Sequence, residues 1–385
     1  MDHATQVDVI ERWLAMHDNA TTQLSAASER LDTAVYRSAE WFAREQVALF
    51  RRGVVVACLA ADVRSPGDHV VLESGGVPLL VTRDSDGNVR AFVNACRHRA
   101  APVAGGCGLG AKNFACPFHA WTYALDGRLL GRPRSQGGFD DVGHSDSSLV
   151  PVPVAEAHGV VFVRPEGDEP IDAHAQLHGL GADLDVFALG GYEVYGRAQR
   201  SWRANWKLLL DTFMESYHVF ALHGASVGPD YPGHVMVHDA FGPHLRIPVP
   251  RASILDLADR PRDEWDLLAH ATVQYHMSPN VMVNHTIDHF ILWRFVPLAV
   301  DRTIAEMTMY VPTASQHMRD DAWEKSMRDW FDLHDAVTRD EDYPESERIQ
   351  RVLDSGRVTE NVLGRNEGAV QHFQRTIRDA VESAG

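Results

Sequence analysis

The sequence predicts an α+β fold in which an antiparallel β domain precedes a second antiparallel sheet that helices cover. Two observations lead to this prediction. From Val54 to about Val163, short β-branched runs alternate with turn dipeptides, which is typical of hairpins. Farther on, strand-like runs between 272 and 311 are flanked by segments with a helical repeat of apolar residues. A length of 385 residues suits two or three domains.

Three segments are expected along the chain. Residues 1–40 form an N-terminal helical segment that packs on the second sheet domain, 41–163 form the β domain and 164–385 form the helix-covered sheet domain. Residues 5–52 are predicted to be helical. Residues 164–180, rich in Pro, Gly, Asp and His, are the best candidate for a linker.

The strands are predicted from β-branched runs, and Asp86-Gly87 and Asp126-Gly127 mark hairpin turns between them. Residues 202–221 are predicted to be helical. The predicted strands are Val54–Val56, Val70–Leu72, Val77–Val81, Val160–Val163, Thr272–Tyr275, Val281–Val283, Ile287–Phe295 and Ile304–Val311.

Charge and hydropathy exclude several classes of partner. The chain has 36 basic and 53 acidic residues, a net charge of −17, so nucleic acid and anionic membrane surfaces are poor partners. No run approaches the roughly 20 apolar residues of a membrane span. The start, Met1-Asp2-His3, shows no signal peptide. We expect a cytoplasmic protein.

A first cluster of metal-binding residues has the pattern C-x-H-x17-C-x2-H, formed by Cys96, His98, Cys116 and His119. Two thiolates and two imidazoles suit either a structural zinc or a two-iron cluster in which one iron takes both Cys and the other both His. The single residue between Cys96 and His98 favours iron, since zinc fingers separate paired ligands by two or more residues.

Two nearby features are interpreted as structural. Cys107 lies between the ligand pairs and is expected to be a small buried thiol. Residues 106–111 match G-x-G-x-x-A, but the dinucleotide fingerprint requires a strand before it and a helix after it, and Cys116 follows too soon.

A second cluster is expected on the helix that ends near Gly224. Asp211, Glu215 and His218 would share a helix face. His218 and His223 are five residues apart, about 140° around a regular helix, so they converge only if the helix ends or bulges. Two imidazoles and a carboxylate form the facial triad of non-haem Fe(II) oxygenases. A zinc or manganese hydrolase is the alternative.

The residues around both clusters resemble one family. Asn94-Ala95-Cys96-Arg97-His98-Arg99 and Cys116-Pro117-Phe118-His119-Ala120-Trp121 strongly resemble the Rieske [2Fe-2S] domain, apart from Ala100, where family members often have Gly. Asn205-Trp206-Lys207, followed by Glu215-Ser216-Tyr217-His218-x4-His223, is similar to the catalytic motif of Rieske non-haem iron oxygenase α (terminal oxygenase) subunits, the aromatic-ring-hydroxylating dioxygenase family. The resemblance implies a helix-grip (START-like) catalytic domain.

The resemblance also implies roles for single residues. Cys96, His98, Cys116 and His119 would hold the cluster, and His218 and His223 the mononuclear iron. The family's Glu-Asp-x4-Glu-x2-Gln pattern assigns the third ligand to Asp342, just before the helix that Pro344 starts, with Asp340 as the fallback.

Neighbouring residues receive weaker assignments from the same resemblance. Glu215 would bridge the iron histidine of one subunit to a cluster histidine of the next, or orient His218. Asn205 and Tyr217 are carried over as near-site catalytic residues. Asp340, Glu341 and Glu345 are otherwise expected in a solvated loop.

The substrate pocket is expected within 225–311, where apolar residues are frequent. Tyr275, Met282, His285 and Leu292 are predicted to contact an apolar substrate, and His285 and His289 to share one face of a strand.

The resulting hypothesis is a terminal oxygenase that hydroxylates an apolar aromatic or polycyclic compound with O2. Its cofactors are a [2Fe-2S] Rieske cluster and a mononuclear Fe(II). A separate reductase, ferredoxin or both would supply electrons from NAD(P)H, and a homotrimer is expected, with or without a small β subunit. One alternative is the oxidative demethylation or monooxygenation of a methylated amine or ether. Another is a Rieske-type electron carrier without oxygenase chemistry.

Overall fold

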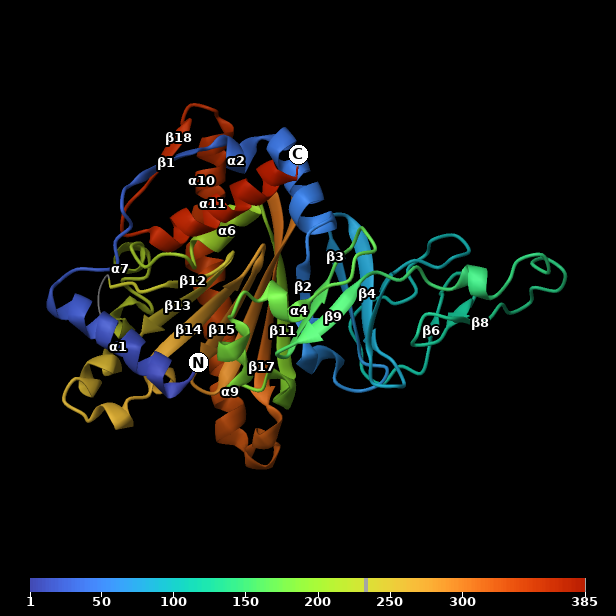
Figure 1. The fold of residues 1–385 in the computed structure, drawn as a ribbon, viewed down its shortest axis with the longest axis horizontal. Helices are drawn as coiled ribbons and strands as arrows, with labels where there is room; N and C mark the ends of the chain where they lie inside the picture. Colours follow the sequence, from blue (N-terminus) through green and yellow to red (C-terminus); the bar gives the residue numbers. More distant parts are fainter. Residues whose placement is uncertain (232–234, 385) are drawn as a thin grey trace. The chain divides into compact units, whose positions relative to one another are not determined.

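The computed structural model describes residues 1–231 and 235–384 (Figure 1). Their contacts group the chain into two compact units. The first unit comprises 1–45, 177–187 and 191–385, and the second comprises 46–176 and 188–190. Each unit has its own sheets and its own core.

The second unit is an antiparallel β structure. Its described residues form three small sheets, with strand orders β2-β10-β9, β3-β4-β5 and β6-β7-β8. The strands are β2 (Val55–Leu59), β3 (His69–Ser74), β4 (Val77–Arg83), β5 (Val89–Val93), β6 (Phe114–Ala115), β7 (Thr122–Tyr123), β8 (Leu129–Gly131), β9 (Val154–Ala157) and β10 (Val160–Val163). The predicted Asp-Gly turns join β4 to β5 and β7 to β8, and both glycines have the positive φ that such turns need.

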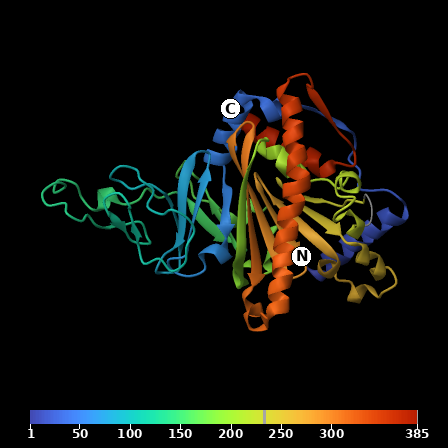
Figure 2. The ribbon, with the colours of Figure 1, turned by 180° about the vertical axis from the view of Figure 1, so that it is seen from behind.

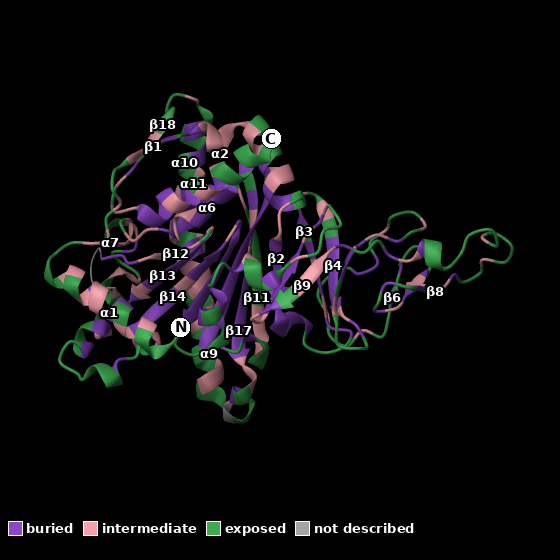
Figure 3. Cartoon of the chain, in the orientation of Figure 1, coloured by how far each residue is buried: buried purple, intermediate pink, exposed green. Residues whose placement is uncertain are grey.

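The first unit is built on a seven-stranded antiparallel sheet with the order β11-β17-β16-β15-β14-β13-β12 (Figure 1). The strands are β11 (Tyr192–Trp202), β12 (Asp239–Phe241), β13 (His244–Pro250), β14 (Ala271–Met277), β15 (Val281–Thr286), β16 (His289–Ala299) and β17 (Arg302–Pro312). A separate ribbon pairs β1 (Glu29–Asp32) with β18 (Glu360–Leu363). Figure 3 shows the large sheet mostly buried.

Helices cover one face of this sheet. α9 (Asp321–Val337), orange in Figure 2, runs across it, and the Trp330 ring of α9 lies 5.4 Å from the ring of His289 in β16. Asp320 caps α9 by accepting the Trp323 N–H at 2.8 Å. The remaining α-helices of the unit are α1 (His3–Asp18), α2 (Ala34–Arg37), α3 (Ala39–Glu45), α5 (Gly181–Asp185), α6 (Trp206–Asp211), α7 (Val219–Leu222), α8 (Leu267–His270), α10 (Tyr343–Asp354) and α11 (Gly368–Ser383).

The first unit boundary lies 5 residues after the predicted boundary at residue 40, and the second lies 13 residues after the predicted boundary at residue 163. Residues 41–45 group with the first unit because Glu45 is buried there and accepts a hydrogen bond from Lys207 Nζ at 2.6 Å. Residues 164–176 group with the second unit, where α4 (Ala173–Gln176) contacts β9. The predicted helical stretch 5–52 is interrupted by β1.

None of the helices in residues 1–231 and 235–384 combines the length and the apolar character that a membrane span requires.

Candidate active site

The two histidines of the second cluster lie at the two ends of a short helix. The helix predicted over 202–221 is broken, because α6 ends at Asp211 and α7 spans only Val219–Leu222. His218 is the N-cap residue of α7 and His223 its C-cap residue. The two ring centroids lie 5.0 Å apart. The expected end or bulge between the two histidines is not present, because the residues between them form α7 and the helix ends at the histidines themselves.

Asp342 approaches the histidines from a π-helical turn. Thr338–Asp342 form this turn between α9 and α10, and Asp342 is buried. Its Oδ1 atom lies 3.6 Å from His218 Nε2 and 3.1 Å from His223 Nε2. A π-helical insertion changes which residues of a helix face inward, and such insertions are frequent at functional sites.

The ligand atoms of these three residues fit a metal ion. All of them lie within 4.8 Å of one another. Asp342 Oδ1 is buried and, among the described residues, meets no donor with hydrogen-bond geometry, even at 3.1 Å from His223 Nε2. A buried carboxylate oxygen that faces two imidazole Nε2 atoms is a set of donor atoms that suits a metal cation. Two imidazoles and one carboxylate are the ligands of a facial-triad Fe(II) site.

Two further carboxylates orient the histidines. Glu215 Oε1 lies 2.5 Å from His218 Nδ1, and Glu341 Oε2 lies 2.6 Å from His223 Nδ1. With Nδ1–H donated to a carboxylate, each Nε2 keeps its lone pair for a metal. Burial alone lowers the pKa of His223, but Asp342 and Glu341 outweigh burial and raise it to about 9. A metal and a proton therefore compete for His223 Nε2.

Glu341 differs from its predicted place in a solvated loop. Besides its contact with His223, it accepts a hydrogen bond from Ser226 Oγ at 2.8 Å. Its neighbour Asp340, the fallback ligand, is exposed and accepts a hydrogen bond from Arg339 Nε at 2.7 Å. The consecutive acids Glu341 and Asp342 both contact His223, one at Nδ1 and the other at Nε2. Both acids belong to the π-helical turn. In the sequence, the only sign that Glu341 belongs to the site is its position directly before the predicted ligand Asp342.

Three further residues of the predicted site do not line the cavity. Asn205 is a buried N-cap of α6: it accepts the Lys207 N–H at 3.1 Å and donates to Val300 O at 2.8 Å. Tyr217 is 59% exposed and does not line the cavity. Asp211 accepts hydrogen bonds from Tyr36 and Gln374, and burial raises its pKa to about 7. Neither Asn205 nor Tyr217 lines the cavity, and the near-site roles that the resemblance implies for them stay predictions.

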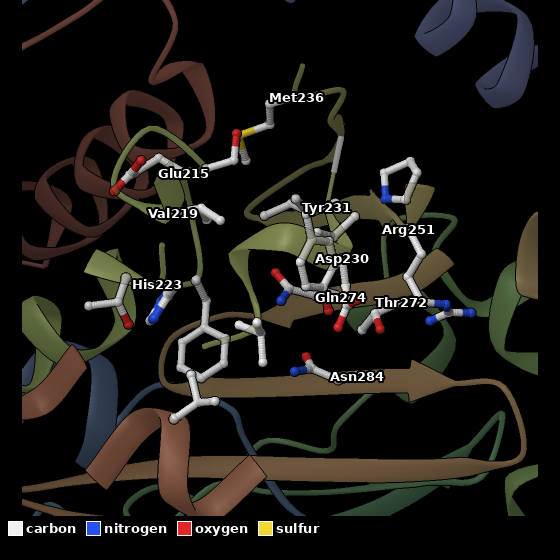
Figure 4. Close-up of a pocket in the computed structure, with 18 of the residues that line it drawn as sticks. Glu215, Val219, His223, Asp230, Tyr231, Met236, Arg251, Thr272, Gln274 and Asn284 are labelled. Carbon is white, nitrogen blue, oxygen red and sulfur yellow. The ribbon is translucent and has the colours of Figure 1, made fainter. Parts of the chain in front are cut away.

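A cavity of about 220 Å³ adjoins the metal ligands (Figure 4). His218, His223 and Asp342 lie in its wall, together with apolar side chains of the helices and the sheet. Its polar lining residues include Asp230, Tyr231, Arg251, Thr272, Gln274 and Asn284. The cavity is therefore less uniformly apolar than expected.

None of the four predicted substrate residues lines this cavity. Tyr275, His285 and Leu292 lie on the opposite face of the sheet, where the rings of Tyr275 and His285 contact Phe187. Met282 has the correct face but pairs with His276, beyond the cavity. The side-chain alternation of a strand explains the error, since a shift of one residue reverses the face.

The residues that line the cavity are immediate neighbours of the predicted ones. Gln274, Asn284 and Trp293 line the cavity, and Gln274 pairs with Asn284 across β14 and β15. For the same reason His285 and His289 do not share a face: His289 contacts α9, whereas His285 stacks on Phe187 at 4.7 Å.

In the other unit, the two cysteine loops have the same backbone design. Cys96 O accepts the Ala100 N–H at 2.8 Å, and Cys116 O accepts the Ala120 N–H at 2.9 Å. Ala100 and Ala120 have φ of 57° and 55°. Ala100 therefore adopts the left-handed backbone conformation, for which glycine is better suited. This conformation is consistent with the Gly that family members often have at this position.

The side chains of these loops converge as a cluster site requires. Cys96 and Cys116 are buried, and His98 Nδ1 lies 3.1 Å from His119 Nδ1. The His98 ring stacks on Trp121 at 5.1 Å between centroids. Two buried thiolates and two imidazoles from paired loops fit a [2Fe-2S] cluster with mixed ligation.

Tyr123 contacts one of the cysteine ligands. Its hydroxyl lies 3.2 Å from Cys96 Sγ and accepts the Arg97 N–H at 3.0 Å. Burial, followed by the Cys96 contact, raises the pKa of Tyr123, so the phenol stays protonated and can donate to sulfur. Hydrogen bonds to ligand sulfurs raise cluster potentials, because they stabilise the more negative reduced form.

Tyr123→Phe is expected to lower the midpoint potential of the cluster by about 40 mV. This value corresponds to roughly 1 kcal/mol of hydrogen-bond energy gained on reduction. The measurement is a redox titration of the holoenzyme followed by the spectrum of the reduced cluster. Thr122→Val, which alters the neighbouring hydroxyl that bonds Ala120 O instead of sulfur, is the control. An unchanged potential in Tyr123→Phe would contradict the assignment.

Two family models match the chain. The ring hydroxylating alpha subunit (catalytic domain) model matches residues 189–383, and the Rieske [2Fe-2S] domain model matches residues 53–151.

Curated relatives match about half of the chain. The carnitine monooxygenase oxygenase subunit of Acinetobacter baumannii is 28% identical over 200 residues, 51% of this chain and 51% of that protein. The anthranilate 1,2-dioxygenase large subunit of Acinetobacter baylyi is 30% identical over 50% of this chain and 42% of that protein. The glycine betaine monooxygenase oxygenase subunit of Chromohalobacter salexigens is 30% identical over 49% and 42%. The chain thus spans about half the length of these relatives, or less.

Solved structures with the same fold cover nearly the whole chain. The quaternary ammonium Rieske monooxygenase CntA in complex with L-carnitine has a TM-score of 0.75 at 20% identity, over 94% of this chain and 97% of that chain. Naphthalene 1,2-dioxygenase from Rhodococcus sp. bound to indole has a TM-score of 0.75 at 18% identity, over 97% and 98%. These likenesses confirm the predicted fold of antiparallel sheets and covering helices.

Proposed function

This chain belongs to the ring hydroxylating alpha subunit family and carries a Rieske [2Fe-2S] domain, and from that premise we propose that it is a terminal oxygenase that monooxygenates a methylated amine. The observation that carries the proposal is the placement of His218, His223 and Asp342 in the wall of a cavity whose far lining is polar. A zinc module or an electron carrier would not need this second site.

The substrate class differs from the leading prediction of an apolar aromatic or polycyclic compound. Two of the relatives named above act on carnitine and on glycine betaine, which supports the alternative of a methylated amine. The polar lining of the cavity supports it too, because an unsubstituted polycyclic hydrocarbon would leave Gln274, Asn284 and Arg251 without partners.

The cavity also contains groups that suit a methylated ammonium. Aromatic rings attract such cations through their faces, and Phe213 and Trp293 line the cavity with centroids 6.0 Å apart. Tyr231 and the carboxylate of Asp230 lie in the same wall. The cavity thus offers both aromatic rings and a carboxylate to a methylated ammonium group.

The chain's own residues position the reaction. His218, His223 and Asp342 would hold the iron, and Glu215 and Glu341 keep the Nε2 atoms of the histidines directed at it. When bound, the iron supplies dioxygen chemistry and the cluster supplies electrons singly. One oxygen atom enters a C–H bond of the substrate, and the other leaves as water after taking up two electrons and two protons.

The electrons must come from outside the chain. We propose a separate flavin reductase, a ferredoxin or both as the source, and an oligomer in which Glu215 lies at a contact between subunits. The exposed ring of Tyr217, next to Glu215 along the chain, supports such a contact, because large exposed aromatic residues are typical of interfaces.

A turnover assay with a surrogate reductase and labelled dioxygen tests the substrate class. Glycine betaine, carnitine, naphthalene and no substrate are compared. We expect oxidation of a methylated amine, with one labelled oxygen atom in the oxidised fragment. Dihydroxylation of naphthalene without amine turnover would contradict the proposal, and a reducible protein with two irons and no turnover on any compound would favour an electron carrier.

A further inference from the structure

One wall of the cavity is a polar stripe on the sheet. Thr272 and Gln274 are two residues apart in β14 and therefore face the same side. Gln274 pairs directly with Asn284 of β15, and both line the cavity. Gln274 Oε1 and Asn284 Oδ1 are buried and accept no hydrogen bond from the described residues. Their amide groups are available to a ligand.

Arg251 stands beside this stripe, on the side of the cavity away from His223 (Figure 4). It follows β13 directly, and its backbone N–H donates to His270 O at 2.8 Å. Its Nη2 donates to Ala269 O at 3.0 Å. Its Nη1 atom is buried and has no hydrogen-bond partner among residues 1–231 and 235–384. The Nη2 atom of the guanidinium is thus held by the backbone, and its Nη1 atom remains available to a ligand.

The charge of Arg251 is also without a counterion. Within the described chain no carboxylate lies within ion-pair distance of it, and burial lowers its pKa from the usual value of arginine. Arg246, five residues earlier, shows the ordinary solution: its guanidinium contacts Asp183 at 2.7 Å and Asp239 at 2.8 Å. A half-buried cation without a carboxylate is costly unless a ligand supplies the anion.

A carboxylate is the anion that fits. Guanidinium and carboxylate match in geometry, and one cation balances one negative charge. A phosphate group carries up to about two charges, and apart from histidines Arg251 is the one basic residue lining the described cavity. The amides of Gln274 and Asn284 add neutral hydrogen-bonding groups next to the charge.

We propose that Arg251 binds a carboxylate of the substrate, so that the substrate is a zwitterion with its carboxylate at Arg251 and its oxidised carbon near His218, His223 and Asp342. This inference rests on the proposed function, because it assumes that the cavity is the substrate site. It narrows methylated amines to those that also carry a carboxylate.

Calorimetric binding to the holoenzyme tests the inference with pairs of compounds. Glycine betaine and choline share a trimethylammonium group, but glycine betaine has a carboxylate where choline has a hydroxymethyl group. Anthranilate and aniline form a second pair with and without carboxylate. We expect the wild-type protein to bind the carboxylate member of a pair at least about tenfold more tightly. Arg251→Gln should weaken the carboxylate member about 10- to 100-fold and change the other less than about threefold.

Two further variants keep the test interpretable. Arg251→Lys keeps the charge without the planar fork and should recover part of the lost affinity. Arg262→Gln removes an exposed arginine that pairs with Glu11 outside the cavity, and it should leave all affinities unchanged. The thermal unfolding midpoint and the spectrum of the reduced cluster confirm that each variant is folded.

The outcomes separate this inference from the proposed function. Turnover of glycine betaine and choline alike, unchanged in Arg251→Gln, would overturn the inference and leave the methylated-amine function standing. Arg251-dependent binding of anthranilate without binding of any methylated amine would support a carboxylate site at Arg251, but it would overturn the zwitterionic substrate and contradict the proposed function. Failure of both carboxylate probes to bind, or tighter Arg251-dependent binding of phosphocholine, would overturn the carboxylate assignment.

Discussion

Asp342→Ala is expected to empty the mononuclear site and to reduce turnover by at least roughly 100-fold, more than the loss of an outer partner costs a metal site. The carboxylate is the only acid that contacts both histidine Nε2 atoms among the described residues, at 3.6 and 3.1 Å. Iron content should fall from about three to about two per chain, while the spectrum of the reduced cluster stays unchanged.

Asp340→Ala is the matched control for that variant. Asp340 lies two residues earlier, is exposed, and pairs with Arg339 instead of the histidines. We expect its iron content and turnover to equal those of the wild type. The assignment of the third ligand is wrong if Asp342→Ala keeps the third iron and its turnover, and Asp340 becomes the ligand if Asp340→Ala loses both.

Glu215→Gln is expected to have the second-largest effect, because Glu215 has two proposed roles. Its carboxylate accepts the Nδ1–H of His218 at 2.5 Å, so the neutral amide should weaken iron binding roughly 10- to 100-fold. If Glu215 also connects the iron site to the cluster of a neighbouring subunit, the turnover of Glu215→Gln should remain at least roughly tenfold below that of the wild type even after excess Fe(II) refills the iron site. Rapid mixing of the reduced holoenzyme with substrate and O2 measures reoxidation of the cluster.

Glu341→Gln separates the two roles of Glu215. Glu341 holds the other histidine in the same way, at 2.6 Å from His223 Nδ1. Its replacement should weaken iron binding to a similar extent, but excess Fe(II) should restore both iron content and cluster reoxidation. Equal recovery of the two variants would show that Glu215 only orients His218 and would remove it from the electron path.

The fold and the family were predictable because they depend on local patterns. β-branched runs separated by Asp-Gly turns led to the hairpins of the second unit, and the structure has them at β4–β5 and β7–β8. The family matches confirm the Rieske domain and the catalytic domain that the two clusters predicted. The unbroken helix predicted over 202–221 was wrong, because the chain leaves the helix after Asp211 and re-enters one only at Val219.

The cavity was not predictable in the same way. Tyr275, His285 and Leu292 were predicted to contact substrate, yet their neighbours Gln274, Asn284 and Trp293 are the residues that line the cavity. Every strand in this part of the sheet is buried on both faces, so hydrophobicity does not distinguish the cavity side from the Phe187 side.

The amino-acid sequence by itself determined the kinds of ligand and their local spacing, in Cys96-x-His98, Cys116-x2-His119 and His218-x4-His223. The two ligands of each pair are at most five residues apart, so the local backbone conformation limits where their side chains can lie. Only the tertiary structure decided which distant groups meet them. Glu341 reaches His223 through a π-helical turn, and Arg251 is left without a carboxylate while Arg246 has two. The physical reason is that strand register and helix packing, which arise from contacts far apart in the chain, determine the face on which each side chain lies.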